Sequence, residues 1–195
     1  TEAIQKLHDQ GIKVLVTVDC GISKVAEVEL ANQLGITVII TDHHNPPDIL
    51  PPAYAVVDPK LGNEIKTRDL SGVAVAFKLA WALYRSAGIN GDSEIKEALD
   101  LVGLGTIADI SPLIYENRIL AAFGLRYLSE SRRPGIQALK EIASVTDQVN
   151  AHAVSFFLAP RLNAAGRVAH AEVAVELLMA QNETQAKERA LALNR

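Results

Sequence analysis

Acidic and histidine side chains directly follow three short apolar runs in the first third of the chain. Asp19 follows Val-Leu-Val-Thr-Val, the triplet Asp42, His43 and His44 follows Thr-Val-Ile-Ile-Thr, and Asp58 follows Ala-Val-Val. If the runs are parallel strands of one sheet, these groups meet at the edge where such sheets bind ligands. Carboxylate and imidazole donors together suit Mn²⁺, Mg²⁺ or Zn²⁺ without selecting among them. A single aspartate after a strand is also a common turn former. The occurrence of such groups after consecutive strands, at the same end of each, favours a metal site instead.

Asp109 is a further candidate ligand, in the segment Leu-Gly-Thr-Ile-Ala-Asp that ends with it. Residues 101–104 directly before this segment's glycine are largely apolar. Burying a carboxylate in apolar surroundings is costly unless it has a partner. A metal ion is one such partner. The alternative is that Asp109 is the N-cap of a helix that begins near Pro112.

Arg161, Asn163 and Arg167 are polar residues in an otherwise small and apolar segment, Ala-Pro-Arg-Leu-Asn-Ala-Ala-Gly-Arg. A guanidinium group matches the geometry of phosphate oxygens, although an arginine can also cap the carboxyl end of a helix. Residues 1–117 carry 9 Lys and Arg against 16 Asp and Glu, whereas residues 118–167 carry 7 against 3. Acidic metal ligands beside a basic phosphate-binding surface would give this asymmetry, and so would a solvated arginine-rich face.

The elements that must position these residues follow an α/β pattern. Residues 13–19, 37–41 and 54–57 predict buried strands, and residues 23–34 predict a helix with Ser23 as its N-cap. The remaining periodic segments predict helices at 71–86, 93–104, 117–128, 134–142, 151–158, 171–179 and 183–193. We therefore expect a parallel sheet with flanking helices in residues 1–110. A mainly helical layer follows in residues 111–195, with no linker between two independent domains.

The composition is that of a globular protein, with 195 residues, 49% of them hydrophobic and 22% charged. No segment reaches the roughly 18–20 apolar residues of a membrane helix, and no signal-peptide pattern is visible. The single cysteine, Cys20, excludes an internal disulfide, and we expect a cytoplasmic protein with no membrane partner. Cys20 is expected to be a small buried side chain rather than a nucleophile. His8, His152 and His170 are expected to be surface or core residues without a catalytic role.

The motifs in their order along the chain resemble those of the DHH phosphoesterases. The resemblance rests on Val-Asp19-Cys-Gly, the Asp42-His-His triplet and Gly-Thr-Ile-Ala-Asp109. Segments 70–78, 116–120, 132–135 and 161–167 narrow the resemblance to the RecJ-type exonucleases of that family. It covers nearly the whole chain. The triplet alone is a weak signal, whereas the ordered set is specific.

This resemblance implies a two-metal centre, usually Mn²⁺ with Mg²⁺ possible, that hydrolyses phosphodiester bonds of single-stranded DNA from the 5′ end in recombination and repair. By the same resemblance Asp19 bridges the two ions, His43 ligates one, and Asp109 ligates the other. His44 contacts the scissile phosphate or the leaving oxygen, and Asp42 orients the histidines.

The resemblance also implies a path for the DNA strand. Arg161, Asn163 and Arg167 would bind its phosphates, and Ser71 and Gly72 at a helix start would add backbone amides. The implied partners are single-stranded DNA, a single-strand-binding protein and a helicase.

Two parts of the family pattern are not found in this sequence. These are the first Asp-x-Asp motif and the C-terminal DHHA1 domain, so we expect residues 1–195 to be a partial catalytic domain that ends at the start of a linker helix. Each metal would keep only two protein ligands, and we expect weak metal binding and little nuclease activity from this chain alone. The alternatives are a DHH phosphoesterase acting on oligonucleotides or cyclic dinucleotides, and a non-catalytic DHH scaffold. The presence of Asp19, His43, His44 and Asp109 argues against the scaffold.

Overall fold

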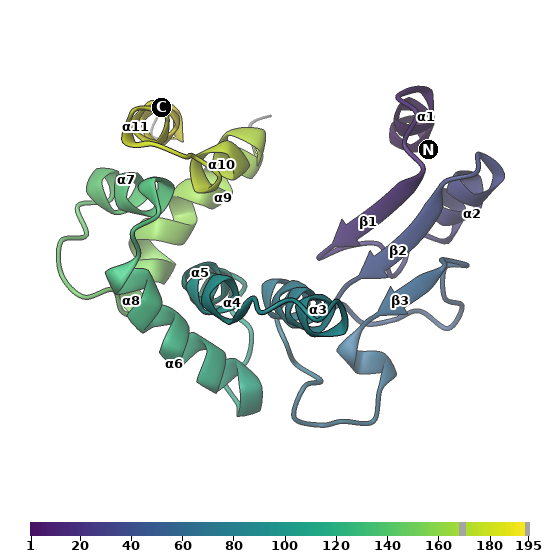
Figure 1. Cartoon of the computed structure of the whole chain (residues 1–195), viewed down its shortest axis with the longest axis horizontal. Coiled ribbons are helices and arrows are strands. Elements are labelled where there is room, and N and C mark those ends of the chain that lie inside the picture. Colours follow the sequence, from purple (N-terminus) through teal and green to yellow (C-terminus); the bar gives the residue numbers. More distant parts are fainter. Residues whose placement is uncertain (168–170, 194–195) are drawn as a thin grey trace. The chain divides into compact units, whose positions relative to one another are not determined.

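A computed structural model describes residues 1–167 and 171–193, without the side chains of residues 164–167 (Figure 1). The chain forms two compact units. We call residues 1–91 with 111–117 the sheet unit, and residues 92–110 with 118–195 the helical unit. The segment 92–110 thus groups with the helices, whereas the expected division lay at residue 110.

The sheet unit is built on three parallel strands in the order β1 (Val14–Val18), β2 (Thr37–Thr41) and β3 (Ala55–Val57). Val18 pairs with Thr41, and Thr41 pairs with Val57. The carboxyl ends of all three strands therefore meet at one edge, as the sequence predicts. The predicted parallel sheet with flanking helices is confirmed, with β1 and β3 slightly shorter than the apolar runs.

Helices α1 (Glu2–Asp9) and α2 (Val25–Gln33) pack on one face of this sheet. Ile4 and Val28 from these helices form a buried cluster with Val38 and Ile40, which alternate along β2 so that both point to the same face. The prediction that Ser23 caps α2 is wrong. Ser23 lies inside a turn in which the Lys24 amide donates to the Gly21 carbonyl at 2.9 Å, so the helix begins only at Val25.

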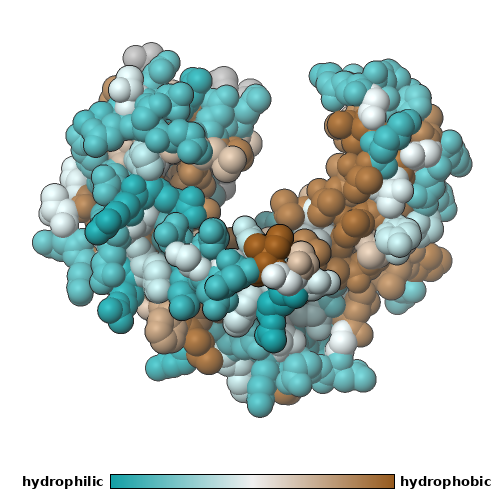
Figure 2. Space-filling model, viewed as in Figure 1, coloured by the Kyte–Doolittle hydropathy of each residue, from teal (hydrophilic) through white to brown (hydrophobic). Residues whose placement is uncertain are grey.

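The opposite face of β1 is largely uncovered in the sheet unit. Val14, Val16 and Val18 alternate along β1 and are 56%, 48% and 58% exposed, and apolar side chains gather over this part of the molecule in Figure 2. The prediction of a fully buried first strand is therefore wrong for these three side chains. The unit is completed by a 3₁₀ turn, η1 (Pro59–Leu61), and by helix α3 (Gly72–Ser86).

The helical unit consists mainly of α4 (Asp92–Glu97), α5 (Leu99–Ala108), α6 (Tyr115–Glu130), α7 (Pro134–Ile142), α8 (Ala151–Ala153), the π-helical turn η2 (Val154–Leu158), α9 (Ala159–Arg167), α10 (Ala171–Leu178) and α11 (Glu183–Leu193). The first turn of α6 belongs to the sheet unit. The core contains Leu128, Ile136, Leu139, Leu158 and Leu177, all fully buried. No described helix is both long and apolar enough to span a membrane.

Several helices of this unit differ from their predicted extents. The predicted helix 93–104 is two helices, α4 and α5, and the predicted helix 151–158 is the short α8 followed by the π-helical turn. Gly103 of α5 and Gly124 of α6 allow close packing, since a Cβ atom on Gly103 would lie 2.6 Å from the Gly124 carbonyl carbon. A side chain at either glycine would therefore force these two helices apart.

Candidate metal centre

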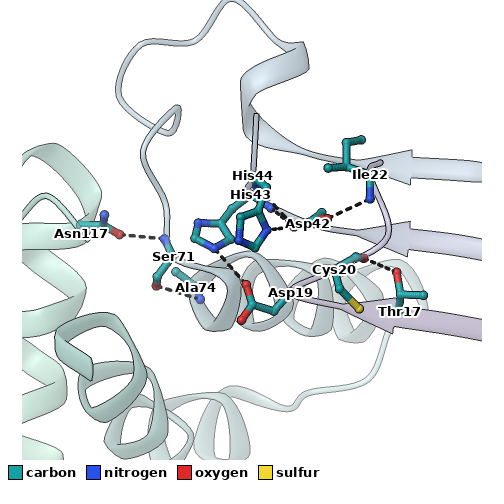
Figure 3. A network of polar contacts seen from close by, with 10 residues as sticks. All are labelled: Thr17, Asp19, Cys20, Ile22, Asp42, His43, His44, Ser71, Ala74 and Asn117. Atoms are coloured by element: carbon teal, nitrogen blue, oxygen red, sulfur yellow. Dashed lines mark hydrogen bonds and ion pairs between the residues drawn. The ribbon is translucent and has the colours of Figure 1, made fainter. Parts of the chain in front are cut away.

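Asp19 projects from a sharp turn at the carboxyl end of β1. Its φ is +60°, a left-handed conformation that few residues other than glycine adopt. The turn is held by the Asp19 amide, which donates to the Thr41 carbonyl at 3.0 Å, and by the Thr17 hydroxyl, which donates to the Cys20 carbonyl at 2.7 Å. The Asp19 carboxylate is 59% exposed, and its Oδ1 lies 2.9 Å from Nε2 of His43 (Figure 3).

Asp42 is buried behind the two histidines and fixes the loop that carries them. Its Oδ2 accepts a hydrogen bond from the Ile22 amide at 2.9 Å. Its Oδ1 accepts from the His43 amide at 2.8 Å and contacts Nδ1 of His44 at 2.7 Å (Figure 3). Only 1% of the residue is exposed. Asp42 therefore contacts both histidines, and its role in orienting them for a metal stays a prediction.

The hydrogen bond between Asp42 and His44 changes the acidity of both groups. Burial by itself raises the pKa of Asp42, but hydrogen bonds from the Ile22 amide, the His44 ring and the two histidine amides outweigh it, so the pKa lies below its usual value. The hydrogen bond to Asp42 is also the main cause that raises the pKa of His44. With Nδ1 of His44 directed at Asp42, Nε2 is the nitrogen left for a metal or a phosphate.

Asp19, His43 and His44 can together hold a metal ion. One ligand atom from each residue lies within 4.8 Å of the other two. A carboxylate with two imidazoles fits a divalent ion such as Mn²⁺ or Zn²⁺, and the carboxylate also suits Mg²⁺. The resemblance assigns His44 to the scissile phosphate or the leaving oxygen instead, and the geometry leaves both roles open to it.

The start of helix α3 lies directly against Asp19. A Cβ atom on Gly72 would lie 2.3 Å from Oδ1 of Asp19, so a residue with a side chain cannot fit there without moving the carboxylate. Ser71 is the N-cap, and its Oγ accepts from the Ala74 amide at 3.4 Å. The N-terminal end of a helix favours negative charge. Phosphate binding by Ser71 and Gly72 stays a prediction. The close approach of Gly72 to the Asp19 carboxylate is a separate reason for a glycine at this position.

Asn117 supports this helix start and was not singled out in the sequence. It is buried, with 2% exposed. Its Oδ1 accepts from the Ser71 amide at 3.4 Å, and its Nδ2 donates to the carbonyls of Asp69 at 2.5 Å and Pro112 at 3.0 Å. Its only signal in the sequence was its place in one of the segments that carry the resemblance.

Asp109 ends helix α5 in the helical unit. Its amide donates to the Gly105 carbonyl at 2.9 Å and it is the C-cap of α5, so the alternative that it caps a helix near Pro112 is wrong. Asp109 is exposed, so the expectation that it lies in apolar surroundings that demand a partner is wrong. Because Asp109 and Asp19 belong to different units, metal ligation by Asp109 stays a prediction.

The predicted phosphate-binding residues lie on α9. Arg161 is half-buried, and its Nη1 donates to the Phe157 carbonyl at 2.7 Å, while Asn163 is exposed. Arg167 ends the helix, and its side chain lies outside the described part of the chain, as does His170.

Asp58, which follows β3, has a structural role at the start of η1. Asp58 is buried, and its Oδ1 caps η1 by accepting from the Lys60 amide at 2.8 Å, which is the turn-forming alternative. Burial raises the pKa of Asp58.

Cys20 is exposed, so the prediction that it is buried is wrong. Its pKa is raised by partial burial of the thiol and by the charges of Asp42 and Asp19, which disfavours a nucleophilic thiolate.

Curated proteins similar to this chain are single-stranded-DNA-specific exonucleases RecJ. The protein from Bacillus subtilis (strain 168) is 41% identical over 195 residues, which is 99% of this chain and 24% of the relative. The protein from Escherichia coli (strain K12) is 44% identical over 197 residues, which is 95% of this chain and 34% of the relative. The chain thus spans about a quarter to a third of these relatives.

Solved structures with the same fold include RecJ from Thermus thermophilus in complex with Mn²⁺. The TM-score is 0.89 at 36% sequence identity, over 100% of this chain and 29% of that one. A second structure, of exonuclease RecJ bound to manganese, gives a TM-score of 0.88 at 37% identity, over 100% of this chain and 49% of that one. The model of the DHH family N-terminal domain matches residues 2–106, including the turn at Asp19 and the Asp-His-His loop. The chain belongs to the DHH family.

Proposed function

We propose that this chain is the metal-binding core of a Mn²⁺-dependent exonuclease that hydrolyses phosphodiester bonds of single-stranded DNA from the 5′ end, in recombination and repair. The observation that carries the proposal is the convergence of Asp19, His43 and His44 within 4.8 Å, with both histidines set by the buried Asp42. The names of the similar proteins, which are single-stranded-DNA-specific exonucleases, support the substrate and the reaction.

Each site residue has a role that its surroundings support. Asp19, His43 and Asp109 would hold the metal, and Asp19 would serve both ions. When bound, two divalent ions supply an activated water and stabilise the departing oxygen. His44 donates to the scissile phosphate or to the leaving oxygen, and the hydrogen bond that its ring donates to Asp42 favours its protonated form. Mg²⁺ is a second candidate ion, because the Asp19 carboxylate is a hard oxygen donor.

The DNA strand is held by its phosphates. Arg161, Asn163 and Arg167 on α9 bind phosphate oxygens, and the amides of Ser71 and Gly72 at the start of α3 add to this binding. A single-strand-binding protein and a helicase are the proposed partners. A reducing, cytoplasmic setting is part of the proposal, because Cys20 is an exposed free thiol.

The test is degradation of 5′-phosphorylated single-stranded DNA with Mn²⁺ or Mg²⁺. Two proteins are compared: this chain, and the Bacillus subtilis relative in which this chain replaces the matched 195-residue region. Circular dichroism checks that the hybrid folds, and Asp19→Ala in the hybrid is the catalytic control. Dinucleotides and cyclic dinucleotides are offered in parallel, to separate a polymer-cutting enzyme from other phosphoesterases.

We expect the hybrid to shorten the strand from its 5′ end with Mn²⁺, and Asp19→Ala to lose at least about a hundredfold in rate. The chain alone should cut far more slowly. A folded hybrid that binds Mn²⁺ and leaves single strands intact contradicts the proposed reaction. Full activity of the chain alone would contradict the expectation that further metal ligands are needed.

A further inference from the structure

Two phenylalanine side chains are exposed immediately before the arginine-bearing helix α9. Phe156 is 66% exposed and Phe157 is 41% exposed. Large aromatic rings lose favourable burial energy when they face water. Adjacent exposed rings beside cationic side chains are the usual means by which proteins grip single-stranded nucleic acid.

Both rings pack against the ring of His152. The His152 ring is stacked on Phe156, with centroids 4.6 Å apart and 29° between the planes. The same histidine meets Phe157 edge-on, with centroids 5.5 Å apart and planes at 67°. We call His152, Phe156 and Phe157 the aromatic cluster. One face of Phe156 is used by His152, and the exposure of the residue leaves area for a further planar group.

The backbone that carries the cluster is a π-helical turn, which is rare and frequently found at functional sites. Pro160 accounts for it, because a proline has no amide to donate and its ring crowds the carbonyl four residues earlier, here that of Phe156. The neighbouring Phe157 carbonyl accepts a hydrogen bond from the Arg161 side chain, whose Nη1 donates to it at 2.7 Å. The cluster and the predicted phosphate-binding arginine are therefore joined by a direct hydrogen bond.

Arg161 retains an unused donor in this arrangement. Its Nε is buried and has no hydrogen-bond partner among the described residues. Buried N–H groups without a partner are uncommon in folded proteins. The residue as a whole is half-buried, so the remaining part of its guanidinium can meet a phosphate oxygen, one helical turn from the rings.

We propose that Phe156, backed by His152, is a stacking platform for a base of single-stranded DNA, while Arg161 and Asn163 bind the neighbouring phosphates. The proposal rests on the proposed function for the identity of the polymer. It adds to that function a sequence-tolerant contact with the base, because every base has a flat face that can stack on a phenyl ring.

The test is binding of two fluorescein-labelled strands in EDTA, which prevents cleavage. One strand is oligo(dT), and the other has the same number of phosphates with abasic residues in place of bases. The variants are Phe156→Ala, Phe156→Leu and Phe156→Tyr. Phe123→Ala is the matched control, since Phe123 is 53% exposed on α6 and has no ring partner among the described residues.

We expect the wild-type chain to bind oligo(dT) about tenfold more tightly than the abasic strand, the lower part of the range for one stacked base. Phe156→Ala and Phe156→Leu should lose this preference and bind both strands alike. Phe156→Tyr and Phe123→Ala should keep it.

Equal preference in Phe156→Ala and wild type overturns the stacking role. Leucine acting as well as tyrosine also overturns it, and indicates that Phe156 is a packing surface for another protein segment. If the wild type binds both strands equally while the hybrid enzyme degrades DNA, the stacking proposal is wrong and the proposed function is not affected. If the wild type binds no single strand and the hybrid cuts none, the proposed function fails with it.

Discussion

At the scale of single residues, Asp42 is the buried group that fixes the loop carrying His43 and His44. One buried carboxylate accepts from the Ile22, His43 and His44 amides and from the His44 ring. It thereby fixes the loop to the sheet and selects the nitrogen that His44 presents. Burying a charge this deeply is costly, and only such a full set of donors offsets the cost.

Replacing Asp42 by asparagine should lower the pKa of His44 toward the usual histidine value, because the charge that favours the protonated ring is removed. Nuclear magnetic resonance titration of the metal-free histidine rings measures this. An unchanged His44 pKa would contradict the hydrogen bond. His8, which lies on α1 and is paired with Asp9, is the internal reference.

The same substitution should reduce the free energy of unfolding by about 3 kcal/mol near neutral pH, the scale for breaking a buried charged network. The pKa of Asp42 is lowered by folding, so its stabilisation is present above the unfolded value of about 3.8 and is lost as pH falls through the folded value. Urea unfolding of wild type and Asp42→Asn should therefore converge at acidic pH. A difference that persists there would show that the cost is steric.

Gly72→Ala should weaken Mn²⁺ binding by at least about tenfold, because the new methyl group would displace the Asp19 carboxylate. Alanine favours a helix more than glycine does, by up to about 1 kcal/mol, so the fold should not suffer as much as the site. Gly62→Ala is the matched control, since a Cβ atom there meets only one atom, at 3.7 Å. Wild-type Mn²⁺ affinity in Gly72→Ala would contradict the placement of Asp19.

At the scale of elements, the start of α3 is positioned by a side chain that comes from far along the sequence. Asn117 accepts from the Ser71 amide and donates to the carbonyls of Asp69 and Pro112. These bonds hold the loop before α3 to the segment before α6. The position of Gly72 against Asp19 therefore depends on a residue in a different helix.

Asn117→Ala should lower the free energy of unfolding by about 2–3 kcal/mol, because it removes three hydrogen bonds that a buried side chain makes. Asn32→Ala is the control, since Asn32 is exposed and makes a single bond to the Pro52 carbonyl. Chemical denaturation of both variants measures the difference. Equal, small effects would show that Asn117 is not a structural link.

The strands and the residues at their ends were predictable because apolar β-branched runs followed by polar residues are a local signal. Asp19 and the Asp-His-His loop therefore fell at the correct edge of the sheet. The break between α4 and α5 and the π-helical turn were not predictable, because helical periodicity continues through both. The turn depends on how Pro160 is accommodated, and the exposure of Val16 depends on what covers the sheet. Neither the turn nor this exposure can be predicted from a local sequence pattern.

At the scale of the whole molecule, the two units carry different chemistry. The sheet unit supplies the acidic and imidazole groups Asp19, His43 and His44. The helical unit supplies Asp109, the arginines of α9 and the aromatic cluster. Positive charges outnumber negative ones in residues 118–167 of this unit. The proposed enzyme therefore draws metal ligands and phosphate-binding groups from both units, and the family match itself extends from the sheet into α5.

The most direct test of this account is a Mn²⁺ titration of the chain at about pH 8, in which electron paramagnetic resonance measures the free ion. Wild type should bind Mn²⁺, and Asp19→Ala and His43→Ala should each weaken binding by about 10- to 100-fold. Asp48→Ala, which removes an exposed carboxylate outside the cluster, should bind as wild type does. If Asp19→Ala and His43→Ala bind Mn²⁺ as tightly as wild type, these residues are not the metal centre and the account is wrong.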